Sequence, residues 1–301
     1  MSSSNESSAI FETNIENLEL IARGKVRDIY RIDDQHMLIV STDRLSAFDV
    51  VFPQPIPQKG ELLTRISNFW FSRTSDMVEN HLSNLKLQDY VSQRDYLQLA
   101  SRSIIVKQLK TLPVEAIVRG YIIGSGWKDY TASGAICGIQ LPAGLQQAEQ
   151  LSEPIFTPST KASVGDHDTN VSFGQVVDLI GEEKSNQVRE IAIQLYKTAA
   201  HYALSRGIII ADTKFEFGIG DNDQLVLIDE ILTPDSSRFW PADQYRVGIS
   251  PPSFDKQFIR DYLETLDWDK VPPAPQIPQA IIDKTQLKYQ QAHDILVGID
   301  S

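Results

Sequence analysis

The stretch from Ile208 to Leu232 constrains the fold most, because it has the pattern of two strands joined by a tight turn. It opens with the apolar run III, continues as ADTKFEFGI, turns at GDNDQ and returns as LVLIDEIL. Apolar and β-branched runs bounded by turn residues are typical of a β-hairpin. Side chains alternate between the faces of a strand, so Asp212, Lys214 and Glu216 are predicted to share one face. The residues of the other face are Thr213, Phe215 and Phe217.

Three charges on one face of an otherwise apolar strand have two interpretations. They form either a solvated outer face or a site in which buried charges meet partners, a metal or a substrate. The apolar residues on both sides favour a site. Asp229, on the return strand, would add a second carboxylate near Glu216, and such a pair suits Mg²⁺ bridging phosphates. Residues that lie opposite each other in the hairpin point to the same face. Asp229 therefore shares the face of Glu216 only if the residue numbers of each pair sum to an odd number, as when Phe215 lies opposite Glu230.

A second constellation lies in the segment PVEAIVRGYIIGSG, at residues 113–126. Glu115 and Arg119 alternate with Ile117 on one face of a predicted strand, which runs into Gly-Ser-Gly. The guanidinium of Arg119 presents a planar fork to a phosphate, and Ser125 with nearby backbone N–H groups would complete an anion cradle. The alternative is an ordinary glycine-rich turn beside a surface arginine.

Two further segments near the N-terminus carry polar residues at strand ends. In GKVRDIY, Lys25 and Arg27 alternate after Gly24, which fits either a phosphate contact or a solvated hairpin edge. STDRLSAFD, at residues 41–49, places polar side chains at the end of a strand, where functional loops concentrate.

The long loop TPSTKASVGDHDTN, at residues 157–170, holds Lys161, Asp166, His167 and Asp168. No other histidine is close in the sequence, so a substrate-contacting loop is favoured over a metal cluster.

Composition narrows the class of protein. The chain has 301 residues and a formal net charge of −12, which disfavours binding to long nucleic acids. Its single cysteine, Cys137, cannot form an intrachain disulfide and fits a reducing compartment. No apolar run approaches the ~18 residues that span a bilayer, and the N-terminus lacks the features of a signal peptide. We therefore expect a cytoplasmic protein without membrane or nucleic-acid partners.

The order of strand and helix patterns predicts an α+β fold with two lobes. A disordered leader is expected over residues 1–12, an antiparallel-sheet lobe over 13–112, and a larger mixed α/β lobe with the C-terminal helices over 113–301. The lobe boundary is placed at residues 111–113, and residues 124–163 are expected to be mostly loop.

Several of these segments, in this order along the chain, resemble the SAICAR synthetase family of de novo purine synthesis. They are GKVRDIY, STDRLSAFD, LPVEAIVRGYIIGSGW, GDHDTN, ADTKFEFG and IDEILTPDSSRFW. The resemblance implies that ATP, CAIR (5-amino-1-(5-phosphoribosyl)imidazole-4-carboxylate) and L-aspartate give SAICAR, ADP and phosphate through an acyl phosphate. It also implies that ATP lies between the two lobes, much as in kinases. The inserts are similar to those of the longer, fungal-like branch, so a monomer is expected.

The same resemblance implies roles for individual residues. Glu216 and Asp229 match the Mg²⁺ ligands, and Lys214 and Asp212 lie beside the reacting carboxylate. Lys25, Arg27 and Lys107 fall on the nucleotide side. The residues expected to contact substrate are Glu115, Arg119, Ser125, Asp235, Arg238, Lys161, His167 and Asp168.

Two other classes of function remain as alternatives. Inositol phosphate kinases also use an Asp-x-Lys strand, but a plain kinase would not require PVEAIVRGYIIGSG. Aspartate-dependent release of ADP would separate a ligase from a kinase. A non-catalytic nucleotide-binding module is the other alternative, but it would not explain the clustered charges of Asp212, Lys214, Glu216 and Asp229.

Overall fold

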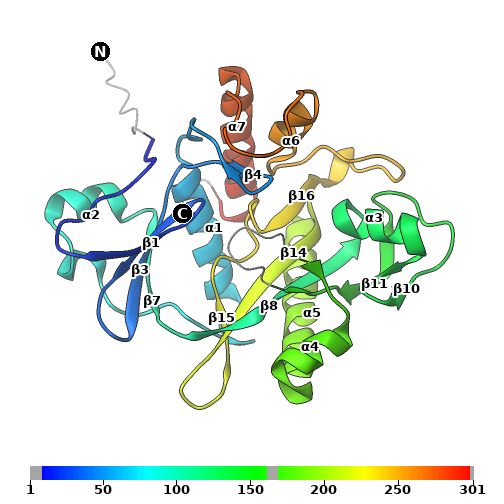
Figure 1. Cartoon of the computed structure of the whole chain (residues 1–301), viewed down its shortest axis with the longest axis horizontal. Helices are drawn as coiled ribbons and strands as arrows, with labels where there is room; N and C mark the ends of the chain where they lie inside the picture. The colour runs from blue at the N-terminus through cyan, green and yellow to red at the C-terminus, as the bar shows by residue number, and fades with distance from the viewer. Residues whose placement is uncertain (1–8, 161–168, 299–301) are drawn as a thin grey trace. The chain divides into compact units, whose positions relative to one another are not determined.

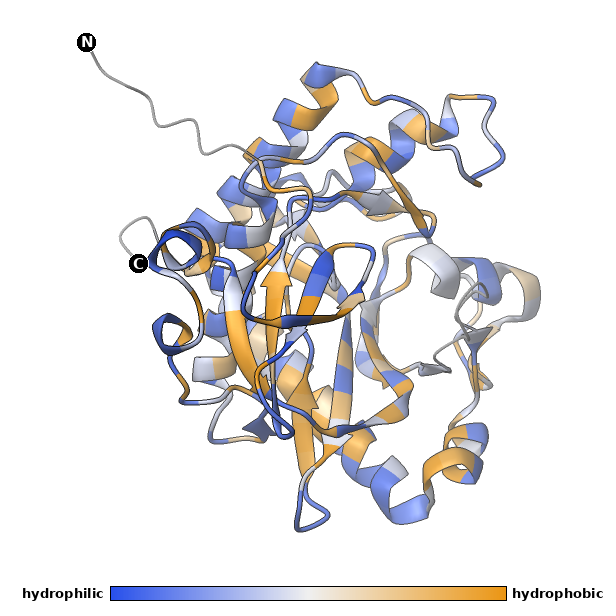
Figure 2. Ribbon diagram, turned by 60° about the vertical axis from the view of Figure 1, so that its left-hand side comes forward, coloured by the Kyte–Doolittle hydropathy of each residue, from blue (hydrophilic) through white to orange (hydrophobic). Residues whose placement is uncertain are grey.

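The computed structural model describes residues 9–160 and 169–298 and divides them into two compact units. Unit 1 holds residues 9–68, 82–108 and 254–298, and unit 2 holds residues 69–81 and 109–253. Figure 2 shows apolar residues concentrated on the strands of the sheets and hydrophilic residues on most connecting turns. No helix in the described ranges is both long and apolar enough to span a bilayer.

Unit 1 is built on a four-stranded antiparallel sheet in the order β1-β2-β3-β7. One face of this sheet forms a hydrophobic core of the unit, in which Tyr30, Leu38 and Ile105 pack with Ile10 and Leu99. On the other face, Ile39 and Val106 are buried, whereas Ile29 and Met37 are half-buried. The strands are β1 (Glu19–Arg23), β2 (Arg27–Arg31), β3 (His36–Ser41) and β7 (Ser103–Lys107).

A second core in unit 1 joins helices from both ends of the chain. Phe52 and Leu62 pack there with Ile259, Ile282 and Tyr289. The contributing helices are α1 (Lys59–Arg73), α6 (Gln257–Glu264) and α7 (Gln279–Leu296). Shorter elements of the unit are β4 (Ser46–Ala47), β5 (Val50–Val51), the 3₁₀ helix η1 (Leu87–Asp89) and α2 (Gln93–Leu99), which Ser92 caps.

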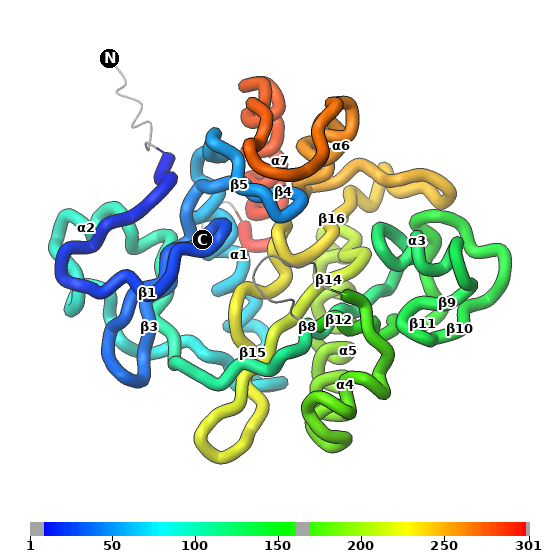
Figure 3. The backbone as a smooth tube through the Cα atoms, viewed as in Figure 1, coloured from blue at the N-terminus to red at the C-terminus, as the bar shows by residue number. Residues whose placement is uncertain are grey.

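Unit 2 is built on an eight-stranded sheet whose two long strands are β8 (Lys110–Tyr121) and β14 (Ile208–Ile219). They run antiparallel and side by side (Figures 1 and 3). The sheet order is β13-β12-β8-β14-β15-β6, with β11 also pairing β8 and β16 also pairing β14. The other strands are β6 (Glu79–Asn80), β11 (Gln150–Phe156), β12 (Ser159–Thr160), β13 (Thr169–Asn170), β15 (Leu225–Ile228) and β16 (Ser237–Pro241).

The long helix α5 (Glu182–Ser205) covers one face of this sheet. A Cβ atom at Gly120 would lie 1.9 Å from the Tyr196 hydroxyl of α5, so only glycine allows this approach. Val118 and Phe215 are fully buried. The face that alternates with Val118 and Phe215 therefore carries the charged residues of β8 and β14. The remaining elements are α3 (Gly124–Ser133), β9 (Ala135–Ile136), β10 (Ile139–Gln140), α4 (Phe173–Ile180) and η2 (Ala242–Gln244).

The units differ from the expected lobes in three places. Residues 9–12 of the expected disordered leader are part of unit 1, because Ile10 is buried and its amide donates to Asp43. Residues 111–113 lie inside β8, so the chain passes between units at residues 108–109 instead. The C-terminal helices belong to unit 1 and not to the lobe expected over 113–301, because their apolar faces pack on Phe52 and Leu62.

Candidate active site

Charged side chains gather on the face of β8 and β14 opposite Val118 and Phe215, which we call the polar face. The ladder places Asp212 opposite Arg119 and Glu216 opposite Glu115, with Lys214 between them. Opposed residues of an antiparallel pair point to the same side of a sheet. The predicted shared face of Asp212, Lys214 and Glu216 is therefore confirmed, and Glu115 and Arg119 join it from the neighbouring strand.

One row across the polar face consists of a carboxylate between two guanidinium groups. β16 places Arg238 opposite Asp212, on the side away from Arg119. Asp212 Oδ2 is 2.6 Å from Arg119 Nη1 and also accepts a hydrogen bond from Arg238 Nη1. Arg119 and Asp212 are buried, whereas the Arg238 side chain is 27% exposed. Burial lowers the pKa of Arg119, and the negative charge of Asp212 opposes that shift. Of the three charged groups in this row, two are guanidinium groups and one is a carboxylate.

The N-terminus of α3 lies against this row. Ser125 Oγ accepts a hydrogen bond from Arg119 Nη2 at 3.0 Å. A Cβ atom at Gly124 would lie 2.4 Å from Arg238 Nη2, and one at Gly126 would lie 3.1 Å from Arg119 Cδ. Both glycines therefore let the helix approach the guanidinium groups. No side chain caps α3 at Ile123, and the first N–H groups of a helix attract anions.

Thr157 is a partner of Arg119 that sequence reasoning did not identify. Its Oγ1 atom accepts a hydrogen bond from Arg119 Nε at 3.0 Å, and the residue is fully buried. Its amide in turn donates to the carbonyl of Ile117. Thr157 thus fixes the plane of the guanidinium from the β11 side.

A second cluster on the polar face surrounds the ammonium group of Lys214. Lys214 Nζ lies 2.6 Å from Glu115 Oε1 and 2.8 Å from Glu216 Oε1. Ser159 Oγ holds Glu115 by donating to its other oxygen at 2.9 Å. Burial alone would lower the pKa of Lys214, but the negative charges of Glu216, Glu115 and Asp229 outweigh it and raise this pKa. Lys214 is therefore a fixed cation in a cluster with an excess of negative charge.

The predicted pairing of the hairpin is wrong. The ladder places Glu216 opposite Ile228, so paired positions sum to an even number and Phe215 is not opposite Glu230. A regular continuation would turn Asp229 toward the buried face. However, β15 ends at Ile228, and Asp229 has a left-handed backbone with φ of 68°. The regular alternation therefore ends before Asp229, whose negative charge is near enough to Lys214 to help raise the pKa of that lysine.

The carboxylates of Glu216 and Asp229 fit the chemistry of a Mg²⁺ site. Both offer hard oxygen ligands beside an excess of negative charge, which is what Mg²⁺ prefers. Residues 9–160 and 169–298 contain no group of three or more histidine, cysteine or acidic residues arranged to hold a metal. A site with two carboxylates is the kind that Mg²⁺ completes with phosphate oxygens and water.

The candidate nucleotide residues lie in unit 1. Lys25 Nζ is 2.5 Å from Asp49 Oδ1, and the lysine side chain is 57% exposed. Arg27 opens β2 and is half-buried. Lys107 lies opposite His36 of β3, and Arg27 lies opposite Ser41 of the same strand. His36 and Ser41 are an odd number of residues apart, so their side chains point to opposite faces of the sheet. Lys107 is thus turned to the opposite face from Arg27, and the sheet does not bring these two predicted nucleotide contacts together.

The remaining predicted substrate contacts divide into two groups. Arg238 and Ser125 belong to the row described above, and Asp235 lies half-buried in the turn before β16. Lys161, His167 and Asp168 lie outside the described residues.

Comparisons with known proteins identify the family to which the chain is similar. The sequence profile of the family described as SAICAR synthetase matches residues 20–275. A phosphoribosylaminoimidazole-succinocarboxamide synthase of Methylococcus capsulatus is 61% identical over 96% of this chain and 98% of its own length. One from Thioalkalivibrio sulfidiphilus is 60% identical over 97% of this chain and 99% of its own. A solved SAICAR synthase from Saccharomyces cerevisiae, complexed with SAICAR, superposes with a TM-score of 0.88. It is 45% identical to this chain and covers 96% of it, with 98% of its own chain matched.

Proposed function

This chain belongs to the SAICAR synthetase family, and we propose that its polar face holds CAIR during the family's reaction. That reaction is the ATP-dependent joining of L-aspartate to the carboxylate of CAIR, which gives SAICAR, ADP and phosphate. The observation that carries the proposal is the adjacency of two clusters on one sheet face. One is the cationic row of Arg119 and Arg238, and the other is the Lys214 cluster.

The cationic row suits the ribose phosphate of CAIR. Arg119 and Arg238 would each present N–H groups to phosphate oxygens, and Ser125 with the first N–H groups of α3 would complete the cradle. Asp212 and Thr157 hold the Arg119 guanidinium in place before the ligand arrives. Such preorganisation reduces the loss of side-chain freedom on binding.

The Lys214 cluster suits the reacting end of the same substrate. A carboxylate is inert toward amines, so it must first be activated. In the first step, a carboxylate oxygen of CAIR forms a bond to the γ-phosphorus of ATP, and ADP leaves. In the second step, the amine of aspartate attacks the acyl carbon, phosphate leaves with the electron pair of the C–O bond, and the amine loses a proton.

Lys214 contributes to both steps as a permanent cation. Its ammonium group would stabilise negative charge that spreads over the transferring phosphoryl oxygens and then over the leaving phosphate. Mg²⁺ held by Glu216 and Asp229 would supply further charge neutralisation at the phosphates. Glu115, fixed by Ser159, orients Lys214 through the 2.6 Å contact.

Unit 1 has features that suit ATP. One face of its sheet carries the half-buried side chains of Ile29, Met37 and Ile104, which would offer an apolar surface for a base. Lys25 follows Gly24 in the loop before β2, and its exposed ammonium group, which pairs with Asp49, would turn to the phosphates. We include Lys25 and Arg27 in the proposed nucleotide site and leave Lys107 out.

An omission assay tests the proposal. Purified protein is incubated with ATP, Mg²⁺, CAIR and aspartate, and ADP and SAICAR are measured with each component left out in turn. We expect both products only with all four present. ADP formation that is undiminished without aspartate would instead support a small-molecule kinase.

The inserts resemble those of the longer, fungal-like branch, and on that ground the proposal is for a monomer, which sedimentation velocity tests. Because CAIR and ATP are phosphorylated anions, we place this activity in the cytoplasm, and fractionation of cells tests that location.

A further inference from the structure

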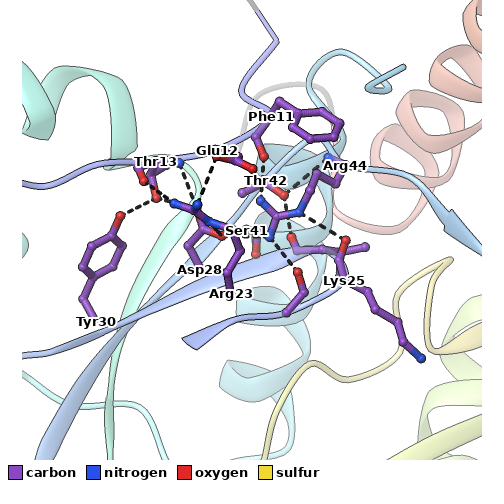
Figure 4. A network of polar contacts seen from close by, with 12 residues as sticks. Phe11, Glu12, Thr13, Arg23, Lys25, Asp28, Tyr30, Ser41, Thr42 and Arg44 are labelled. Atoms are coloured by element: carbon purple, nitrogen blue, oxygen red, sulfur yellow. Dashed lines mark hydrogen bonds and ion pairs between the residues drawn. The ribbon is translucent and has the colours of Figure 1, made fainter. Parts of the chain in front are cut away.

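The segment Ser41–Arg44, part of the STDRLSAFD motif, has no role in the reaction described above, yet its polar side chains are buried. Thr42, Asp43 and Arg44 are each at most 3% exposed. Figure 4 shows that Thr42 and Arg44 point toward the loop that carries Lys25. A buried guanidinium group is costly unless its hydrogen bonds are satisfied, so the partners of Arg44 indicate what it does.

Arg44 and Thr42 hold three successive carbonyl groups of the Gly24–Val26 loop. Arg44 Nη2 donates to Gly24 O at 2.9 Å, and Arg44 Nε donates to Lys25 O at 3.2 Å. The amide and the hydroxyl of Thr42 both donate to Val26 O, at 3.0 and 2.8 Å. The loop is closed on itself by a hydrogen bond from the Gly24 amide to Arg27 O at 2.8 Å. The carbonyls of this loop are thus drawn inward, while the Lys25 side chain stays exposed.

Arg44 is itself fixed from the opposite side. Its Nη2 atom donates to Asp28 Oδ1 at 2.8 Å, and its Nη1 atom donates to Phe11 O at 2.6 Å. The second oxygen of Asp28 accepts from the amide and the hydroxyl of Thr13, each at 2.8 Å. Burial alone would raise the pKa of Asp28, but the hydrogen bonds from Arg44 and Thr13 lower it, so the carboxylate stays charged. One guanidinium therefore ties the N-terminal segment, β2 and the Gly24–Val26 loop together.

We propose that Arg44 is a positioning residue for ATP, which sets the backbone of the Gly24–Val26 loop so that Lys25 is presented to the nucleotide phosphates. Arg44 does not touch the nucleotide and acts through the carbonyls of Gly24 and Lys25. This inference rests on the proposed function, because it takes Lys25 as a phosphate contact.

The test compares Arg44→Lys with Lys25→Ala in steady-state kinetics. Lysine keeps the charge beside Asp28, but the three N–H groups of its single nitrogen cannot serve all four acceptors that the guanidinium holds, which include both loop carbonyls. We expect Arg44→Lys to raise the KM for ATP about ten- to hundredfold, the range that follows from losing hydrogen bonds of a charged group. The KM values for CAIR and aspartate should change less than about twofold, within the usual additive error for independent sites.

Arg102→Lys is the matched control. Arg102 is the other deeply buried arginine of this region, 1% exposed, and it pairs with Asp43 and Glu61. Its replacement removes a buried guanidinium without touching the loop carbonyls. An equal rise in the KM for ATP in both variants would reduce Arg44 to a structural role and overturn the inference.

A second variant and a second measurement guard against a folding defect. Thr42→Val keeps the shape of the side chain and the backbone bond but removes the hydroxyl bond to Val26 O, so it should raise the KM for ATP more mildly. Hydrogen exchange of peptides covering residues 24–31 should be faster in Arg44→Lys and Thr42→Val than in the wild type. Unchanged exchange and an unchanged KM for ATP in these variants would refute the positioning role.

Lys25→Ala distinguishes a failure of the proposed nucleotide contact from a failure of the proposed role of Arg44. If Lys25→Ala leaves the KM for ATP unchanged, the proposed nucleotide contact is wrong, and the inference fails with it. If Lys25→Ala raises the KM for ATP but Arg44→Lys and Thr42→Val do not, only the inference about Arg44 fails.

Discussion

Asp212 lies directly opposite Arg119 in the β8–β14 ladder, and Asp212 Oδ2 is 2.6 Å from Arg119 Nη1 in a buried ion pair. Removing one partner of such a pair leaves an uncompensated charge, so the pair fixes the geometry of both strands at this point. Arg238 uses the same carboxylate oxygen from the other side. The row is therefore set before any ligand binds, and its specificity depends on the planar shape of the guanidinium groups.

Arg119→Lys tests this dependence on shape. Lysine keeps the positive charge opposite Asp212 but loses the fork that also reaches Ser125 and Thr157. We expect CAIR binding to weaken by about 1–3 kcal/mol, the range for hydrogen bonds to charged groups, as measured by isothermal titration calorimetry.

Arg189→Lys serves as the control for that measurement. Arg189 lies on α5, where it stacks over Phe173 and donates to Asn186, so its replacement should leave CAIR affinity unchanged. If Arg119→Lys weakened ATP binding and left CAIR binding unchanged, the anion site at Arg119 and Ser125 would have been assigned to the wrong ligand.

Gly124→Ala tests the approach of α3 to Arg238. Gly124 has φ of +60°, and an added Cβ atom would lie 2.4 Å from Arg238 Nη2. The guanidinium is the far end of a flexible side chain, so it should move aside while the fold persists. We expect the KM for CAIR to rise roughly tenfold, as for the loss of one hydrogen bond to a charged group.

The matched control is Gly134→Ala, at the other end of α3. Gly134 also has a positive φ, +74°, but an added Cβ atom would meet nothing within 4 Å. Its replacement should cost about 1–2 kcal/mol of stability through backbone strain alone, with an unchanged KM for CAIR. Equal kinetic effects of the two substitutions would show that strain, and not Arg238, is responsible.

Glu216→Gln tests the proposed Mg²⁺ site. The amide keeps the shape of the side chain and its oxygen toward Lys214, so the thermal unfolding midpoint should stay close to that of the wild type. The Mg²⁺ concentration for half-maximal rate should rise at least about tenfold, since even partners of metal ligands typically contribute about 10–100-fold. Glu153→Gln, which changes an exposed carboxylate paired with Lys197, should leave the Mg²⁺ dependence unaltered. An unchanged Mg²⁺ dependence in Glu216→Gln would remove this residue from the metal site.

The shared face of Asp212, Lys214 and Glu216 was predictable because alternation along a strand is a local property. The same rule places Glu115 and Arg119 on one face of β8. Pairing between strands is not local in this sense. A shift of one residue in the pairing turns every side chain of a strand to the other face relative to its neighbour. The sequence of the hairpin did not reveal that Glu216 pairs with Ile228.

Asp229 and Thr157 show two other limits of the sequence. Asp229 departs from strand alternation through a left-handed backbone, which is uncommon outside glycine and could not be located from IDEIL alone. Thr157 contacts Arg119 across 38 residues of chain, and an isolated threonine carries no signal of such a partner. Likewise, residues 124–163 were expected to be mostly loop, yet α3 begins at Gly124 because its packing overrides the low helix propensity of glycine. The apolar faces of α6 and α7 could be anticipated, but not the unit on which they pack.

The protonation of Lys214 gives a prediction that depends on pH. Its pKa is raised by the charges of Glu216, Glu115 and Asp229, so the ammonium form persists above the usual pKa of a lysine. At pH 9 the neutral amine, which is the form that reacts with acylating reagents, should be rarer at Lys214 than at an ordinary lysine. We expect acetic anhydride at pH 9 to label Lys214 much more slowly than Lys197, whose side chain is 53% exposed, with labelling read by mass spectrometry.

Slow labelling alone would also follow from poor access, because the Lys214 side chain is only 33% exposed. Glu216→Gln separates the two causes: it keeps the shape around Lys214 but removes one of the negative charges that raise its pKa. The lysine should therefore lose its proton at lower pH, and labelling at pH 9 should become faster in the variant. Labelling of Lys214 that is as fast as that of Lys197 in the wild type would show that the amine is available as a base, contrary to its proposed role as a permanent cation.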